Sequence, residues 1–385
     1  MDLNYFNKIL IKFIEKYPFF VDPIVIFRTD SEIKKSYFSS WIIDFNYPEI
    51  DKILKIVDVL EKELKKISLE LNNIVFEEKY IKEEYINRID DFYKILKIIK
   101  IFYNEDEEEK FNLINEYFGI DLKQIWNIFK NRIFYLNYFK TDSFLLKEEQ
   151  IIFLKNNEIG AEKIKFYFEE ALKYLNLDSF WKIKVDNSIS IVHTNFNKKW
   201  WEIIIPKYRI INLQKLLELI IHEIDWHCVQ FSEVEWLYSW SIRFSKSESL
   251  LEWYSMFLES LLSSKYFWIN RLELLFERKE IHYNYIKNKI ELEELLKNST
   301  GDIFRIFRWF RNIKNYSNLK DMVYLQWIVQ VIDNLEKYWN FLEIIKKGVI
   351  NQKYIDKYWV KSDTKEEINL EKTSAVYILN KYFIL

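Results

Sequence analysis

The chain has 385 residues, of which 49% are hydrophobic and 30% charged, with a formal net charge of −2. This balance argues against a nucleic-acid-binding protein, which needs clustered excess lysine and arginine, and the single cysteine, Cys228, excludes an internal disulfide framework. No stretch reaches the ~18–20 uncharged apolar residues of a membrane span, and the N-terminus resembles an amphipathic helix rather than a secretory signal, so we expect no membrane association and a cytoplasmic location.

Residues 1–150 are expected to form helices joined by short loops. The segment 48–71 carries apolar residues at helical spacing with lysine and glutamate between them, and the segment 77–104 repeats the pattern. The segment 157–177 predicts a further amphipathic helix.

The pattern changes after residue 180. Three short segments are rich in β-branched and aromatic residues and roughly alternate, which predicts strands at 180–186, 188–194 and 200–206. We expect a small antiparallel sheet with a hairpin turn at 195–199, a long helix over about 212–230, and helices again from 246. The fold class expected is α+β and predominantly helical, with a helical region over 1–150 and a catalytic-type region over 151–385.

The predicted helix 212–230 carries His222-Glu223-x-x-x-His227, one residue longer than the zinc-protease signature H-E-x-x-H. A catalytic zinc site takes three protein ligands and leaves one position for water, and a nearby carboxylate can take the proton of that water. His222 and His227 supply two imidazoles, and Glu223 supplies a base.

The spacing sets a geometric condition. At ~100° per residue, positions five apart in an ideal helix lie about 140° apart around the axis. The two histidines can therefore share a metal ion only if the helix is locally widened, as in a π-bulge, or ends near His227. The alternative is two unrelated histidines, one of them on the core face.

Further motifs follow in order along the chain. "LLEWYSMFLE" contains Glu252, "RIFRWF" contains Arg305 and Arg308, and "LKDMVYLQW" contains Lys320 and Tyr324. With the His-Glu-His stretch, these segments resemble the motifs H-E-x-x-x-H, E-E-G-L-A-x-Y, R-x-x-R-G and K-D-x-x-Y-x-x-G of the microtubule-associated tyrosine carboxypeptidase family and its bacterial QEGLA-motif relatives. The resemblance covers about residues 150–360.

The resemblance implies a zincin-like region with a Zn²⁺ ion held by His222, His227 and Glu252, and Glu223 as general base. Arg305 and Arg308 would bind the terminal carboxylate of a peptide; the alternative is that they are solvated helix arginines. Lys320 would also bind substrate. Tyr324 would donate to the oxyanion, with a packing role as its alternative.

Other polar residues are expected to have supporting, structural or surface roles. Asp321 is a candidate partner of a ligand histidine, whereas Asp225 is expected to be a surface acid. His193 and His282 are expected in structural or surface roles, and Cys228 in the core.

The use of glycine and tryptophan is unusual. Glycine appears 4 times and tryptophan 14 times, whereas average usage of roughly 7% would give about 27 glycines. The motif positions where the resembled family carries glycine or another small residue hold Trp226, Trp253, Trp309 and Trp327. One hypothesis is that these positions are glycine in the natural protein, through reassignment of the UGA codon; the alternative is genuine tryptophan enrichment.

The function predicted from the sequence is a zinc-dependent, carboxypeptidase-like peptidase that acts on a peptide or protein C-terminus. Two alternatives stay open. The first is a catalytically degenerate helical binding or regulatory module of the same fold, and the second is a metal-dependent hydrolase of a non-peptide bond.

Overall fold

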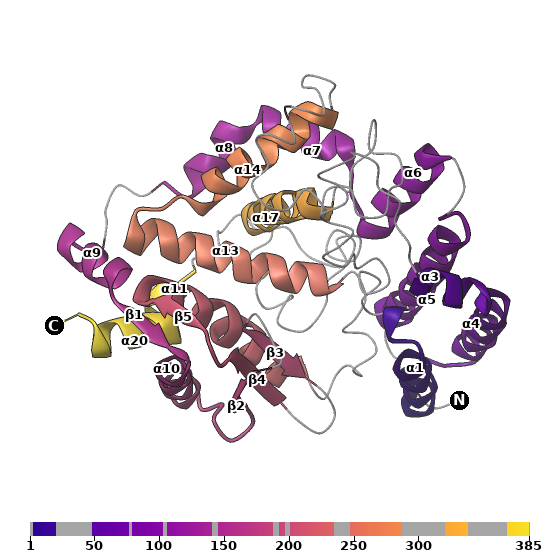
Figure 1. Cartoon of the computed structure of the whole chain (residues 1–385), viewed down its shortest axis with the longest axis horizontal. Helices are drawn as coiled ribbons and strands as arrows, with labels where there is room; N and C mark the ends of the chain where they lie inside the picture. The colour runs from indigo at the N-terminus through magenta and orange to yellow at the C-terminus, as the bar shows by residue number, and fades with distance from the viewer. Residues whose placement is uncertain are drawn as a thin grey trace. The chain divides into compact units, whose positions relative to one another are not determined.

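The structure is a computed structural model that describes residues 3–20, 48–76, 79–102, 106–140, 145–187, 192–196, 201–234, 247–286, 294, 320–337 and 368–384. The described chain is predominantly helical with small sheets, which confirms the coarse α+β prediction (Figure 1). No helix in these ranges is long and apolar enough to cross a membrane.

Contacts between residues divide the chain into two compact units that alternate along the sequence. Unit 1 comprises Met1–Phe129, Ser241–Lys246 and Leu275–Gln326, and unit 2 comprises Lys130–Trp240, Ser247–Leu274 and Trp327–Leu385. Unit 1 contains residues 1–129 of the helical region expected over residues 1–150. The division at residue 150 stays a prediction.

Unit 1 is helical throughout its described part. Its elements in the N-terminal third are α1 (Leu3–Lys16), η1 (Pro18–Phe20), α3 (Pro48–Leu54), α4 (Val57–Asn72), α5 (Lys79–Lys100), α6 (Glu107–Phe118) and α7 (Leu122–Lys130). The expected helix 48–71 is split into α3 and α4 by a turn at 55–56, and Ile56 is exposed. Within α4 the expected periodicity is confirmed, because Leu60, Leu64 and Ile67 are buried.

Unit 2 contains every strand described. Its elements are α8 (Arg132–Tyr138), α9 (Glu148–Asn156), β1 (Glu158–Gly160), α10 (Ala161–Tyr174), β2 (Lys182–Asp186), β3 (His193–Phe196), β4 (Trp201–Pro206), β5 (Ile210–Asn212), α11 (Leu213–Leu219), η3 (Ile220–Cys228), α12 (Val229–Val234), α13 (Ser247–Phe267), η5 (Leu370–Lys372) and α20 (Ser374–Tyr382). Two further helices, α14 (Arg271–Ile286) and α17 (Lys320–Lys337), contain residues of both units.

The three-stranded sheet is mixed rather than wholly antiparallel. Strand order is β2-β4-β3; β3 pairs antiparallel with β4, as expected of a hairpin, but β2 pairs parallel with β4. Ile203 and Ile205 of the central strand β4 are fully buried. Strand β3 is left at the edge, next to the helix that carries the histidines. A short antiparallel pair, β1 with β5, was not expected from the sequence.

The helix that carries the histidines begins immediately after β5. Asn212 is its N-cap, and the Asn212 side chain accepts a hydrogen bond from the Lys215 amide at 2.8 Å. α13 packs along α11 and η3, and α20 packs against α10, α11 and η3 (Figure 1). The expected helix 212–230 is therefore confirmed, and it lies among packed neighbours of unit 2.

Candidate metal centre

The two motif histidines lie on a π-helical turn. Helix α11 passes into η3, a π-helix over Ile220–Cys228, before α-helical geometry resumes at Val229. The rings of His222 and His227 lie 5.0 Å apart between centroids at an interplanar angle of 67°. The local widening required by the five-residue spacing is confirmed, and the two imidazoles are neighbours.

Glu223 is buried beside them. Its residue is 7% exposed, and its carboxylate Oε2 accepts a hydrogen bond from the hydroxyl of Thr194 on the edge strand β3. Because β3 contacts η3, the hairpin of the mixed sheet fixes the orientation of this carboxylate. Sequence analysis did not identify Thr194.

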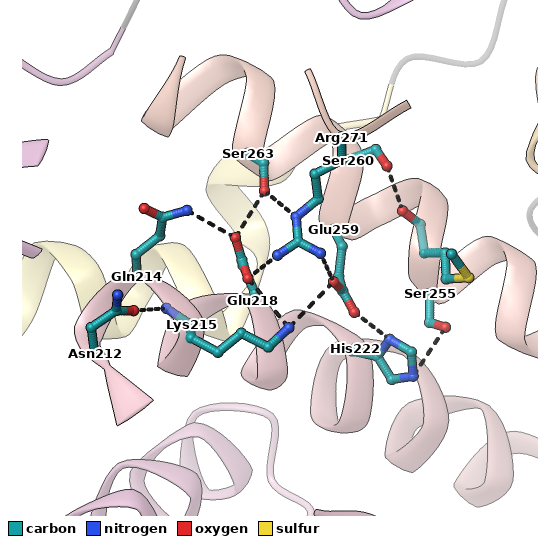
Figure 2. Close-up of polar contacts among 11 residues, drawn as sticks. Asn212, Gln214, Lys215, Glu218, His222, Ser255, Glu259, Ser260, Ser263 and Arg271 are labelled. Carbon is teal, nitrogen blue, oxygen red and sulfur yellow. Dashed lines mark hydrogen bonds and ion pairs between the residues drawn. The ribbon is translucent and has the colours of Figure 1, made fainter. Parts of the chain in front are cut away.

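His222 is held by helix α13 (Figure 2). Its Nδ1 lies 2.6 Å from Glu259 Oε1, and its Nε2 lies 3.4 Å from Ser255 Oγ. A histidine that binds a metal ion through one ring nitrogen usually donates a hydrogen bond from the other nitrogen to a carboxylate. That carboxylate fixes the tautomer and the orientation of the ring.

Glu259 belongs to a network of charged residues. Arg271 Nη1 donates to Glu259 Oε2 at 2.5 Å, and the same guanidinium is paired with Glu218. Lys215 Nζ lies 3.3 Å from Glu218 Oε2 and 3.8 Å from Glu259 Oε2. Burial acts to raise the pKa of Glu259, but the hydrogen bond with His222 and the positive charges of Lys215 and Arg271 outweigh it and lower that pKa.

Asp225, inside the motif, is not the surface acid expected. It is partly buried, and its carboxylate accepts from the amides of Ser374 at 2.6 Å and Ala375 at 3.0 Å, at the first turn of α20. Burial raises the pKa of Asp225 to about 6, against the opposing effect of these hydrogen bonds. Asp225 therefore connects the motif helix to the C-terminal helix.

Trp226 and Cys228 occupy the core. Trp226 is 1% exposed and its ring centroid lies 4.2 Å from that of Tyr254. Its Nε1 has no hydrogen-bond partner within the described part of the chain. Cys228 is fully buried, as expected, and burial raises the pKa of its thiol well above the usual value, which keeps it protonated.

The third expected ligand, Glu252, lies in α13, but its side chain is outside the described part of the chain. Its position precedes Ser255 by three residues and Glu259 by seven, which places it on the helix face that carries these two partners of His222. Among the side chains that are described, no group of three His, Cys, Asp and Glu that could hold a metal ion is found.

The remaining predicted site residues are not brought to this centre by the described contacts. Arg305 and Arg308 lie outside the described residues, as do Trp309 and the side chains of Lys320, Asp321 and Trp253. Tyr324 is half-buried in the part of α17 that belongs to unit 1. The roles predicted for these residues stay predictions.

The described side chains supply two imidazoles, which are groups that zinc ions bind in proteins, and the third expected ligand is outside the described part of the chain. The two imidazoles lie edge to face on one turn, and one of them has a buried carboxylate on Nδ1. With Nδ1 of His222 bonded to Glu259, Nε2, which lies 3.4 Å from Ser255 Oγ, is the ring nitrogen that corresponds to the metal-binding atom in carboxylate–histidine–zinc sites.

Comparison with known proteins adds no relative. No protein-family model matches the chain, and neither a curated protein nor a solved structure matches it. The likeness to the tyrosine carboxypeptidase family rests on the sequence motifs alone.

Proposed function

We propose that this protein is a zinc-dependent peptidase of the carboxypeptidase type. The observation that carries the proposal is the π-helical turn, which brings His222 and His227 to a ring separation of 5.0 Å beside the buried Glu223. A helix is widened in this way at a cost in regular hydrogen bonding, and such turns gather at functional sites.

His222, His227 and Glu252 would hold the metal ion. Zinc in such a site supplies Lewis acidity: it lowers the pKa of water toward ~7 and polarises a carbonyl group. Helix α13 supports the proposed third ligand, because the face that contains position 252 already contacts His222 through Ser255 and Glu259.

Glu223 would take a proton from the attacking water and pass it to the leaving amine. The hydroxyl of Thr194 restricts rotation of the Glu223 carboxylate by bonding to Oε2. This leaves Oε1 for the proton transfer.

Residues outside this turn would recognise the substrate. In the proposal, Arg305, Arg308 and Lys320 bind the terminal carboxylate of a peptide, for which guanidinium groups suit bidentate contact. Tyr324 would donate a hydrogen bond to the developing oxyanion.

Zinc content and hydrolysis test the proposal together. Purified protein is expected to contain one zinc ion per chain by elemental analysis, and His222→Ala and His227→Ala should lose it, because each removes one ligand. Glu223→Gln should keep the zinc but lose hydrolysis of peptide libraries by at least about 100-fold, as expected for loss of a general base.

Two results would overturn the proposal. Wild-type protein with no more zinc than His222→Ala would favour a degenerate binding module. Zinc-loaded protein that cleaves no library peptide, with a free or an amidated C-terminus, would favour hydrolysis of another bond. A requirement for the free C-terminus is the expected sign of a carboxypeptidase.

A further inference from the structure

The contact between Glu259 and His222 has the geometry of an orienting hydrogen bond. The Nδ1–Oε1 distance is 2.6 Å, and the two side chains are only 12% and 9% exposed. An ionised carboxylate can only accept a hydrogen bond. Nδ1 therefore carries the proton, and in the neutral form of the imidazole, which is the form that binds a metal ion, the lone pair lies on Nε2, 3.4 Å from Ser255 Oγ.

The Glu259 carboxylate is itself held in place. Its Oε2 accepts from Arg271 Nη1 at 2.5 Å. The guanidinium is fixed in turn by Ser263, whose Oγ lies 3.0 Å from Arg271 Nε. Figure 2 shows Arg271 between the two carboxylates, with His222 beyond Glu259 and Ser255 at the other ring nitrogen of His222.

Glu218 provides a natural comparison within the same network. It is 2% exposed, it pairs with Arg271 and Lys215 as Glu259 does, and Ser263 Oγ donates to it at 3.2 Å. The contacts described for Glu218 are with these residues and Gln214, and none is with His222. The two glutamates thus share cations and burial but differ in contact with the histidine.

We propose that Glu259 is the positioning residue of the metal centre, and that Arg271 holds it in place. Glu259 fixes the Nδ1–H tautomer of His222 and aims Nε2 toward the metal, and Arg271 stops the carboxylate from turning away. This inference rests on the proposed zinc function, and it adds a residue pair that the sequence motifs do not contain. Loss of such a partner typically weakens metal binding by about 10- to 100-fold.

The test compares Glu259→Gln with Glu218→Gln in the full-length protein. Both variants remove one buried negative charge from the Arg271 network, so both are expected to lower the free energy of unfolding. Only Glu259→Gln should raise the zinc dissociation constant, measured by competition with a chelator, by about 10- to 100-fold. Glu218→Gln should bind zinc as the wild type does.

The tautomer gives a second measurement that needs neither zinc nor a glutamate variant. The chain has 4 histidines, so ¹⁵N-histidine labelling yields a spectrum that single His→Ala variants can assign. In metal-free wild-type protein, neutral His222 is expected to carry its proton on Nδ1.

The outcomes separate this inference from the proposed function. If the wild-type protein binds no zinc, the proposed metal function is wrong, whatever the tautomer of His222. Wild-type protein that binds zinc, with equal affinities in both glutamate variants, overturns the role of Glu259 alone. A proton on Nε2 of metal-free His222 overturns it independently.

Discussion

At the scale of single residues, two buried tryptophans of unit 2 differ in what their indole nitrogens contact. Trp181 is 3% exposed and its Nε1 donates to Ser232 Oγ at 3.2 Å. Trp226 is 1% exposed, and its Nε1 finds no acceptor in the described part of the chain. A buried donor without an acceptor destabilises a fold, because the donor gives up its hydrogen bonds to water.

Replacing each tryptophan with phenylalanine should therefore have unequal effects. Trp181→Phe removes a hydrogen bond and leaves Ser232 without its donor, whereas Trp226→Phe removes only an unsatisfied group. Urea unfolding is expected to show a loss about 1 kcal/mol larger for Trp181→Phe than for Trp226→Phe. The two changes remove the same atoms, so an equal or larger loss for Trp226→Phe would contradict this account.

The hypothesis that Trp226 stands in place of a natural glycine concerns the same site. The indole is fully enclosed and contacts Tyr254, so its absence would leave a large space beside Tyr254. Mass spectrometry of native peptides that span residues 226 and 253 decides the identity of both positions.

At the scale of secondary-structure elements, helices α10 and α20 are joined by one acceptor. Glu170 on α10 accepts from Tyr382 Oη at 2.6 Å, from Lys381 Nζ at 2.9 Å and from Lys173 Nζ at 3.0 Å. The hydrogen bonds from Tyr382, Lys381 and Lys173 lower the pKa of Glu170 to about 2. The ionised form is therefore favoured by folding.

This contact predicts a specific pH dependence. Because the folded pKa lies below the ordinary value, the stabilisation is complete above about pH 4.5 and is lost as the pH falls toward about 2. Glu170→Gln should lower the free energy of unfolding at pH 7 by about 1 kcal/mol, since two of the partners are largely exposed to solvent, and by less at pH 3.

Glu169→Gln is the matched control. Glu169 is adjacent, 46% exposed, and 3.8 Å from Lys165, so its replacement should change stability little at either pH. A Glu170→Gln effect that stays constant from pH 7 to pH 3 would show that the carboxylate charge is not what joins the helices.

At the scale of the whole molecule, the C-terminal segment completes unit 2. Helix α20 buries Ser374, Ala375, Val376, Ile378 and Leu379. It packs against α10, α11 and η3, and its first two amides bond to Asp225 of the motif helix. Asp225 is 149 residues from Ser374 and 150 residues from Ala375 in sequence, so the motif helix and α20 share one core although they are far apart in the chain.

A chain that ends at residue 367 should lose the cooperative unfolding of unit 2. The buried side chains of Val376, Ile378 and Leu379 in α20 alone contribute about 5 kcal/mol to the free energy of unfolding, which is comparable with the stability of a typical domain. In addition, Asp225 would lose both of its amide donors. A chain that ends at residue 383 keeps α20 and is expected to unfold at the wild-type urea midpoint. Equal midpoints for the two truncated chains would contradict this role of α20.

Local sequence pattern predicted the elements but not their pairing. The apolar periodicity identified α4, α5 and α10, and the alternation identified β2 and β4. β3 (His193–Phe196) overlaps the strand expected at 188–194 by only two residues and includes the first two residues of the turn expected at 195–199. The parallel pairing of β2 with β4 and the β1–β5 pair arise from contacts between distant segments, which periodicity does not record. The split between α3 and α4 was missed because Ile56 fits the apolar repeat yet lies at a turn.

The sequence by itself determined the chemistry available at the centre: two imidazoles and a glutamate, at a spacing that requires a widened helix if they are to meet. That requirement follows from residue rotation along a helix, a local property. Only the tertiary structure decided the partners of these groups, including Thr194, Glu259 and Arg271, and the role of Asp225. Hydrogen bonds and ion pairs between segments far apart in the chain depend on how helices pack, and no local pattern specifies that packing.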